Sequence, residues 1–341
     1  MDRQIYKIRK NCRLCKSLDI EKVVEIGKTP VSEKYAISKD QKPDDLLVPL
    51  DLYFCTKCSH VQLIHVVDPD FLWDKFTFKT SRNPKLSSHY NNYVKDILNF
   101  SKSDLKRNLV VDIGSNDGTL LKIFKNNGFN KVLGIDPAKE IAKEANLNGI
   151  ETIPKYFDFN LSKEIKSKHG LANIVTANNV YAHIDDMDGI TDSIKNILSK
   201  DGIFSFEVSY LLDVIEKNLI GTIFHEHLSY HSLSALDKYF RKKELEIIEV
   251  LRNPLQGGSI VCYAQHKGGK YLPSESINKI LKIEDKLDLN KKISLKKFNN
   301  NLISFKKKLN LTLDKLLEQK KRIVGFGSAR SATTFINYFN I

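Results

Sequence analysis

The segment between residues 108 and 209 alternates short apolar runs with stretches of helical periodicity. The runs "VVDI", "KVLGID", "ANIVTAN" and "GIFSFEVSY" predict strands, whereas "TLLKIFKN" and "MDGITDSIKNILSK" repeat apolar residues at steps of three and four and predict helices. Strands and helices that alternate at this spacing predict an α/β fold. We expect a doubly wound parallel sheet that binds its ligand at the carboxyl ends of the strands.

A second helical pattern follows near the C-terminus. Apolar residues at 295, 298, 302, 305, 309, 313 and 316 predict amphipathic helices. From Lys267 to Arg322 the chain holds 16 Lys and Arg against 6 Asp and Glu, which is most of its net charge of +13. Lysines on the wet face of helices explain this excess. A nucleic-acid groove would also need interleaved aromatic residues, so we expect no nucleic-acid partner, although a basic surface can steer a phosphorylated substrate.

The length of 341 residues allows two or three domains, each with a core of its own. The N-terminus "MDRQIYKIRK" is charged and lacks the apolar core of a signal peptide. No apolar run approaches the about 18 residues that a membrane span needs. We therefore expect a cytoplasmic protein without membrane contact, as a monomer or a homodimer.

Four of the five cysteines form two pairs, Cys12 with Cys15 and Cys55 with Cys58. Each Cys-x-x-Cys directs two thiolates at one ion, and two such knuckles complete the tetrahedral shell that Zn²⁺ favours. Four thiolates leave no open position, so we expect a structural zinc. A redox dithiol or an iron–sulfur cluster are the alternatives, and His60 and His65 could substitute as ligands. Cys262, in "GSIVCYAQH", is expected to be a buried strand residue.

The stretch "DIGSNDGTLL" combines a strand, a glycine-rich turn and a helix start. It lacks Gly-Lys-Ser/Thr and Gly-x-Gly-x-x-Gly, which argues against a phosphate loop and weakens a dinucleotide interpretation. The next strand ends at Asp136, where a carboxylate can accept hydrogen bonds from a ribose diol. This order of elements resembles a class I S-adenosylmethionine-dependent methyltransferase.

That resemblance implies a set of cofactor contacts. The methionine part would lie against the glycine turn, the ribose against Asp136, and the sulfonium against the asparagines that end the next strand. The cofactor-binding candidates are Asp112, Gly114, Asn116, Asp117, Gly118, Asp136, Asn178 and Asn179. The asparagines could instead cap helices or turns.

The stretch "GTIFHEHLSYHS" places three histidines and a glutamate within seven residues. His225 and His227 share one side of a strand, and His227 and His231 could share a helix face, but neither spacing is His-Glu-x-x-His. A catalytic metal, histidines satisfied by local hydrogen bonds, and a proton-transfer site are the three interpretations of the residues alone.

Together with both Cys-x-x-Cys pairs, "DIGSNDGTLL", "ANNVYAHIDD" and "GGSIVCYAQH", this stretch resembles the zinc-containing sugar-nucleotide C-methyltransferases of deoxysugar biosynthesis. The resemblance implies an N-terminal zinc domain over 1–70, a methyltransferase domain over 71–250 and a C-terminal substrate-binding domain over 251–341. It also implies that the "FHEH" motif, with His225, carries the catalytic machinery. His227 would be the general base and Glu226 would lie beside it.

This chain departs from the family at positions that usually carry tyrosine. Phe224 precedes "HEH", Phe76 and Phe78 lie in an upstream segment, and Gln256 begins "QGGS" where His-Gly-Gly-Ser is expected. Phe78, Phe224 and Tyr230 are candidate substrate contacts. Because phenol donors for an enolate are lost, methylation of a sugar hydroxyl is an alternative activity. A non-catalytic cofactor-binding or scaffold protein is another.

The final stretch "KRIVGFGSARSATTFINYFNI" predicts a strand, a glycine turn and a helix. It resembles the opening of the family's C-terminal nucleotide-fold domain, only begun where the chain stops. We expect strands between Val250 and His266 to complete this layer, since one strand and one helix cannot bury both faces of a sheet. Gly325, Gly327 and Arg330 are candidates for the diphosphate of a nucleotide-sugar.

Overall fold

The structure is a computed structural model that describes residues 5–31, 47–73, 77–100, 107–327 and 329–341. The chain forms two compact units. The first unit comprises Met1–Asp68, Tyr210–Ala235 and Ile283–Ile341, and the second comprises Pro69–Ser209 and Leu236–Lys282. Within the described ranges, no helix combines the length and apolar character that crossing a membrane requires.

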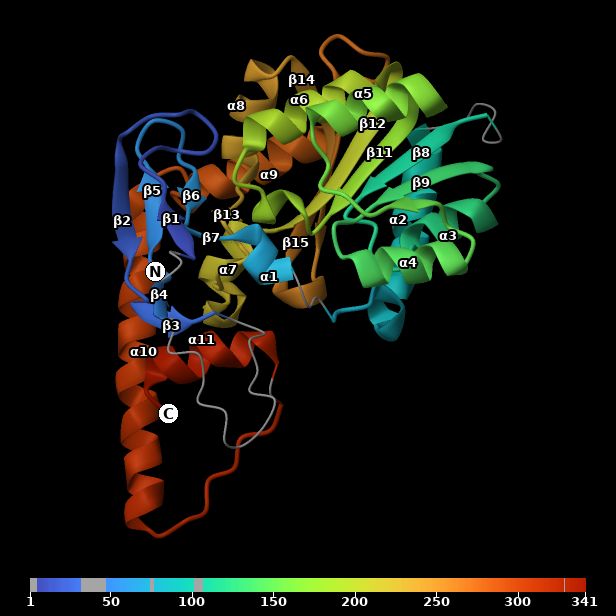
Figure 1. The fold of residues 1–341 in the computed structure, drawn as a ribbon. Coiled ribbons are helices and arrows are strands. Elements are labelled where there is room, and N and C mark those ends of the chain that lie inside the picture. Colours follow the sequence, from blue (N-terminus) through green and yellow to red (C-terminus); the bar gives the residue numbers. More distant parts are fainter. Residues whose placement is uncertain (1–4, 32–46, 74–76, 101–106, 328) are drawn as a thin grey trace. The chain divides into compact units, whose positions relative to one another are not determined.

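A seven-stranded sheet forms the centre of the second unit, as far as it is described (Figure 1). Across the sheet the strands are β10 (Thr152–Ile153), β9 (Lys131–Ile135), β8 (Leu109–Ile113), β11 (Ala172–Asn178), β12 (Leu198–Ser209), β15 (Ser259–His266) and β14 (Leu245–Asn253). The first five are parallel and β15 runs antiparallel to both of its neighbours. The doubly wound α/β fold is therefore confirmed, with one antiparallel strand added.

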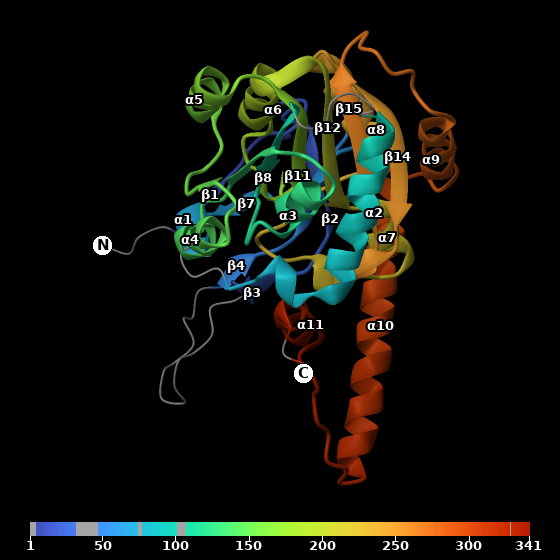
Figure 2. The ribbon, with the colours of Figure 1, turned by 90° about the vertical axis from the view of Figure 1, so that its right-hand side faces the viewer.

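Helices cover both faces of this sheet, which is why strands such as "LVVDI" are buried along their whole length. Figure 2 shows α5 and α6 on one side and α2 on the other. Apolar residues of α2 and α3 pack on β8, β11 and β15, whereas Tyr181, Phe206 and Phe240 stack on the opposite face. The helical elements are α1 (Pro69–Trp73), η1 (Thr80–Arg82), α2 (Pro84–Phe100), α3 (Thr119–Asn126), α4 (Lys139–Leu147), α5 (Phe159–His169), η2 (Tyr181–His183), α6 (Met187–Ile197) and η4 (Leu255–Gly257).

The first unit is built from short strands, short helices and the 27-residue helix α10. Its four-stranded sheet has the order β13 (Ser229–Tyr230), β6 (Val61–Gln62), β5 (Leu52–Cys55) and β2 (Ile20–Val24). Two strand pairs join β1 (Tyr6–Ile8) to β7 (His65–Val67) and β3 (Lys28–Pro30) to β4 (Leu47–Pro49). Its helices are α7 (Leu211–Glu216), η3 (Ile220–Thr222), α10 (Lys292–Glu318) and α11 (Arg330–Phe339). By sequence, α8 (Leu233–Lys242) and α9 (Glu275–Lys286) contribute to both units.

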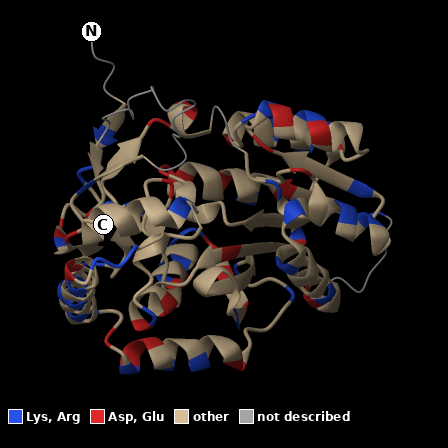
Figure 3. Cartoon of the chain, turned by 90° about the horizontal axis from the view of Figure 1, so that it is seen from below, with Lys and Arg blue, Asp and Glu red and all other residues tan. Residues whose placement is uncertain are grey.

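The amphipathic pattern of α10 is confirmed over its first half, where Leu295, Phe298 and Leu302 are buried. Beyond that point Leu309, Leu313 and Leu316 of the predicted stripe are half-buried, whereas Leu311 and Leu317 are more than half exposed. Figure 3 shows Lys and Arg interspersed with Asp and Glu over the face in view, without a stripe of one sign. This distribution agrees with lysines as solvated helix faces.

Two expectations about the C-terminal region are wrong. The strands β14 and β15 do not complete a C-terminal layer; they extend the sheet of the second unit, where β15 pairs with β12. Residues 321–327 do not form a strand, and Phe326 is fully exposed. A strand needs a neighbour to take its backbone hydrogen bonds, and no described strand lies beside this stretch. The helix that follows it is present as α11.

Candidate functional site

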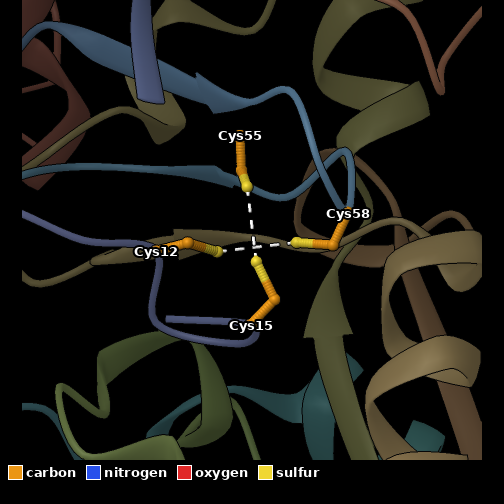
Figure 4. A group of neighbouring side chains, drawn as sticks. All are labelled: Cys12, Cys15, Cys55 and Cys58. Carbon is orange, nitrogen blue, oxygen red and sulfur yellow. Dashed lines mark hydrogen bonds between the residues drawn. The ribbon is translucent and has the colours of Figure 1, made fainter. Parts of the chain in front are cut away.

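The two cysteine pairs come together in the first unit (Figure 4). The sulfur atoms of Cys12 and Cys58 lie 3.5 Å apart, as do those of Cys15 and Cys55, and all four lie within 4.8 Å of one another. A tetrahedral zinc with bonds of about 2.3 Å spaces its sulfurs by about 3.8 Å. The donor set therefore fits Zn²⁺, with no coordination position left for chemistry.

The negative charge of four clustered thiolates also requires a bound cation. Burial raises the pKa of the Cys55 thiol to about 11. The hydrogen bond with Cys12, followed by burial, raises the pKa of Cys58. Four thiolates this close repel one another, so all four ionise together only around a metal ion. The nearby His60 and His65 are not among the four ligands of this cluster. Instead, the His60 Nε2 lies 3.1 Å from Ser229 Oγ, and the His65 ring packs against Tyr6.

The zinc knuckles hold the chain segment that follows His227. In the sheet, Gln62 of β6 pairs with Ser229 of β13. The side chain of Arg13, which follows Cys12 and is fully buried, donates hydrogen bonds to the carbonyls of Leu63 and Leu228. Folding of the metal site therefore fixes the end of the histidine segment within the first unit.

The glycine turn of the second unit follows β8, as expected. Gly114 has φ +72°, and a Cβ at this position would lie 2.3 Å from a methyl group of Val180. Gly118 has φ +77° and begins α3. A left-handed backbone without side chains allows close approach of a ligand, so this turn is shaped as a cofactor cradle.

The side chains of Asn116 and Asp117 hydrogen bond to the neighbouring segment 78–81. Asn116 accepts hydrogen bonds from the backbone and hydroxyl of Thr80 and donates to the carbonyl of Phe78. Asp117 accepts from the backbone of Ser81 at 3.0 Å. Burial opposes ionisation of Asp117, but hydrogen bonds from Ser81 and Thr119 outweigh it and lower its pKa. The predicted cofactor residues thus anchor segment 78–81 beside the turn, which the sequence did not indicate.

The carboxylate of Asp136 lies at the end of β9 in the predicted position. Its two oxygens accept the backbone N–H groups of Asn116 and Ala138, both at 2.9 Å. Burial raises its pKa. Asp112, by contrast, points within the sheet and accepts a hydrogen bond from Thr176 at 2.6 Å; burial raises its pKa to about 7. Asp136 remains a ribose candidate, and Asp112 has a structural partner.

At the end of β11 the buried amide of Asn178 makes no hydrogen bond of ordinary geometry among the described residues. A buried amide normally has partners, so this side chain fits a ligand contact better than a turn cap. The next residue, Asn179, has φ +56° and donates its backbone N–H to the carbonyl of Glu207 at 2.8 Å. Asn179 therefore contributes to the turn through its backbone.

The histidines of "FHEH" face different partners within the first unit. His225 is buried, and its Nε2 lies 3.0 Å from the carbonyl of Val48 in β4. His227 keeps some exposure, and its Nδ1 lies 2.9 Å from the carbonyl of Thr222. Burial lowers the pKa of each ring to about 4. Both are neutral imidazoles near pH 7, and no metal-binding group of His, Cys, Asp and Glu forms here among the described residues.

Glu226 pairs with the guanidinium of Arg330 at the start of α11. The guanidinium carbon also lies 5.8 Å from the centre of the Phe224 ring, and that ring lies 4.0 Å from the His227 ring. Two candidates far apart in sequence therefore meet at this segment. The arginine is next to the predicted base and lowers its pKa further.

The other candidate substrate-binding residues differ in their burial and surroundings. Tyr230 of β13 is buried, with its ring 6.4 Å from that of His227. Phe78 is 38% exposed beside the glycine turn. Gly325 and Gly327 lie in the exposed stretch 321–327 with no atom near their Cβ positions, and Phe76 lies outside the described residues. These roles stay predictions.

Comparison with known sequence families covers nearly the whole chain. Residues 86–250 match a family described as "Methyltransferase domain", residues 12–73 one described as "Putative zinc binding domain", and residues 254–341 one described as "C-methyltransferase C-terminal domain". The C-methyltransferase NovU of Streptomyces niveus is 35% identical over 256 residues, which is 74% of this chain. Each of these three parts of the chain is thus similar to a part of methyltransferase proteins. The chain spans 60% of the length of NovU.

The matches also agree with the two expected cofactors. The methyltransferase domain uses S-adenosylmethionine, for which the glycine turn is the candidate site, and the four clustered cysteines lie in the zinc-binding part. Among solved structures, an S-adenosylmethionine-dependent methyltransferase from Anabaena variabilis ATCC 29413 is 19% identical and covers 52% of this chain and 84% of its own, with a TM-score of 0.40. Magnesium protoporphyrin IX methyltransferase from Synechocystis PCC 6803 is 16% identical over 57% and 90%, with a TM-score of 0.42.

Proposed function

We propose that this chain transfers a methyl group from S-adenosylmethionine to a carbon beside a ketone in a nucleotide-linked sugar, with His227 as the general base. The observation that carries this proposal is the match to all three parts of the C-methyltransferase architecture, together with 35% identity to a C-methyltransferase. The nucleotide-sugar substrate rests on the resemblance of the "FHEH" segment and its companion motifs to the sugar-nucleotide enzymes.

The chemistry needs a base because a carbon beside a ketone is a poor nucleophile until it loses a proton. The Thr222 carbonyl can only accept a hydrogen bond, so His227 carries its proton on Nδ1 and presents Nε2 as the basic nitrogen. With a pKa of about 4 the ring is neutral near pH 7 and available to take a proton. General-base catalysis of this kind contributes about 10²–10⁴ in rate.

In this reaction His227 takes the carbon-bound proton, and the electron pair of that bond becomes the enolate that accepts the methyl group. When bound, S-adenosylmethionine would supply the electrophilic methyl, with a neutral thioether as the leaving group. The proton on His227 then passes to water.

A second candidate function is O-methylation of a sugar hydroxyl. It is favoured by one observation: Phe224, which packs on the His227 ring, has no hydroxyl to stabilise an enolate. Transfer to a hydroxyl needs a base but no enolate.

The test uses the full chain, loaded with zinc. Calorimetry measures S-adenosylmethionine binding, and methyl-labelled donor is then incubated with a panel of nucleoside-diphosphate keto sugars and the corresponding hydroxy sugars. We expect labelled keto sugar. Label only on hydroxy sugars would establish the O-methyl activity, binding without label a scaffold role, and absence of binding would remove every enzymatic interpretation.

A further inference from the structure

Helix α11 packs against the segment that carries His227, and both belong to the first unit. The hydroxyl of Thr334, which is almost fully buried, donates a hydrogen bond to the carbonyl of Ile223 at 2.7 Å. Arg330 lies one helical turn earlier, on the same side of α11, and forms an ion pair with Glu226. Two side chains of one helix therefore hold this segment at two points.

The approach between α11 and the segment is close enough to require a glycine. A Cβ at Gly221 of η3 would lie 2.9 Å from the Cβ of Ser331 on α11. Packed interiors do not accommodate such an overlap without moving the backbone. The next residue, Thr222, places its carbonyl 2.9 Å from Nδ1 of His227. Helix α11 therefore bounds the turn that orients the imidazole ring.

The far end of α11 is held by α10, which lies beside it in Figure 1. Phe339 is fully buried, and its ring lies 5.2 Å from that of Phe305 on α10 and 4.5 Å from that of Phe335. The ammonium group of Lys306 on α10 lies 5.0 Å from the centre of the Tyr338 ring. Side chains that are locked by packing hold a site on a rigid element. The first turn of α11 is thus a fixed support for the segment.

The ion pair also sets the charge beside the proposed base. The side chain of Glu226 is 3% exposed and that of Arg330 is 21% exposed. Removal of one partner from a buried ion pair leaves an uncompensated charge. The Arg330 cation lowers the pKa of His227, after burial, which is the largest cause. An uncompensated carboxylate on the residue before His227 would have the opposite effect.

We propose that Arg330 and Thr334 are positioning residues, which hold segment 221–227 and with it the orientation of the His227 ring. This inference rests on the proposed carbon methylation with His227 as the base. It assigns the Arg330 guanidinium to Glu226, whereas the sequence made Arg330 a candidate for the diphosphate of a nucleotide-sugar. The two roles differ in their kinetics. Loss of a diphosphate contact raises KM, but a displaced base lowers kcat.

The pH dependence of turnover reports the charge of this site. The described titratable groups around the His227 ring are Arg330 of α11, Tyr230 of β13 and the adjacent Glu226. Burial raises the pKa of Tyr230, so its phenol stays neutral. The base acts as the neutral ring, so turnover should fall as the pH decreases through its pKa of about 4. Loss of Arg330 removes a like charge and leaves a carboxylate, and both changes raise this pKa.

The experiment uses the full, zinc-loaded chain and compares Arg330→Gln alone with Arg330→Gln combined with Glu226→Gln. The matched control is Arg241→Gln, because Arg241 pairs with Asp237 at 2.8 Å within α8, outside the first unit. At pH 8 we expect Arg330→Gln to lower kcat by about 10- to 100-fold, with KM for the keto sugar within about threefold of wild type. Its acid limb should shift upward by about one pH unit.

The double variant separates this role from a general loss of structure. It has no uncompensated carboxylate, so we expect its acid limb to shift less than that of Arg330→Gln. Arg241→Gln should keep the kinetics of the wild type. A raised KM with unchanged kcat in Arg330→Gln, or an acid limb that does not move, would overturn the proposal.

A second variant tests the same role if Arg330→Gln does not fold. Thr334→Val keeps the shape of the side chain but cannot donate to the carbonyl of Ile223. We expect kcat to fall by up to about tenfold with KM unchanged. An unchanged kcat in Thr334→Val would contradict the positioning role.

If no sugar of the panel is methylated, the proposed function fails, but the inference can still be tested by nuclear magnetic resonance. The His227 ring signal is identified as the one that His227→Gln lacks. Its pKa should rise by about one unit in Arg330→Gln and stay at the wild-type value in Arg241→Gln. An unchanged pKa of His227 in Arg330→Gln would overturn the inference.

Discussion

The two histidine–glutamate groups of this chain are built in opposite ways. In the first unit Glu226 lies between two histidines in sequence, yet it pairs with Arg330, and the rings bond to backbone carbonyls. In the second unit His89 and Glu207 are 118 positions apart in sequence and lie 2.7 Å apart in space. Adjacent residues point in different directions along a chain, so proximity in sequence indicates the residue types of a site but not their pairing.

The surroundings of the two rings also differ. Burial, and to a smaller degree the charge of Arg330, lowers the pKa of His227 to about 4, which suits a neutral base. At His89 a carboxylate oxygen lies directly against one ring nitrogen.

Loss of zinc should have the largest effect and should act on the first unit alone. Replacement Cys55→Ser removes one of four thiolates, and structural zinc sites contribute about 10–16 kcal/mol to folding. Because the knuckles hold β13, we expect metal content to fall from one equivalent to almost none and the unfolding temperature of the first unit to drop. Metal analysis and calorimetry measure this. We expect the Cys55→Ser variant to bind S-adenosylmethionine with the affinity of the wild type. Loss of this binding would contradict the prediction that zinc removal affects the first unit alone.

Acid should destabilise the first unit next. The pKa of His225 is lowered by burial from 6.5 to about 4, so the unfolded chain binds its proton first. Stability is full above pH 6.5 and falls as the pH decreases toward 4, by about 3 kcal/mol for this residue. Denaturant titrations at pH 7.5 and 4.5 check the sign. His225→Gln should flatten the difference, and an unchanged pH dependence in that variant would show that other groups cause it.

Replacement of the proposed base comes third. His227→Gln removes the basic nitrogen, and we expect turnover to fall by about 10²–10⁴ with donor affinity within twofold. Deuterium exchange at the acceptor carbon should fall equally, because it needs the same proton transfer. Turnover close to that of the wild type would make His227 a structural residue.

The smallest effect is expected for Glu226→Gln. The amide oxygen can still accept from Arg330, the ion-pair partner of Glu226, and the His227 ring is held by the carbonyl of Thr222. We expect turnover to fall less than about tenfold. A loss as large as that of His227→Gln would show that Glu226 acts on the base directly, and the contrast between the two groups would then fail.

Much of the architecture follows from local patterns in the sequence. Cysteine spacing predicted the metal cluster, because both ligands of a knuckle lie within four residues. Strand–turn–helix periodicity predicted β8, the glycine turn and α3, and the position of Asp136 follows from the same repeat. These features depend on residues close together in the chain, and the three family matches agree with them.

Features that depend on tertiary pairing could not be predicted in this way. The strand β15 was expected in a C-terminal layer, but an apolar strand does not encode its neighbour, and it joins β12. Anchoring of Thr80 by Asn116 and pairing of Glu226 with Arg330 likewise join distant residues. Among these residues only Glu207 could be recognised as unusual in the sequence, because it is a single charged residue inside the apolar run "GIFSFEVSY".

Carbon methylation can be tested by the position of the new methyl group in the product. The full chain would be incubated in heavy water with zinc, carbon-13 methyl donor and a nucleoside-diphosphate keto sugar, and the product would be examined by nuclear magnetic resonance. We expect a labelled methyl on the carbon beside the ketone, with deuterium in recovered substrate at that same carbon. A methyl group on oxygen, or a donor that binds without any transfer, would contradict it.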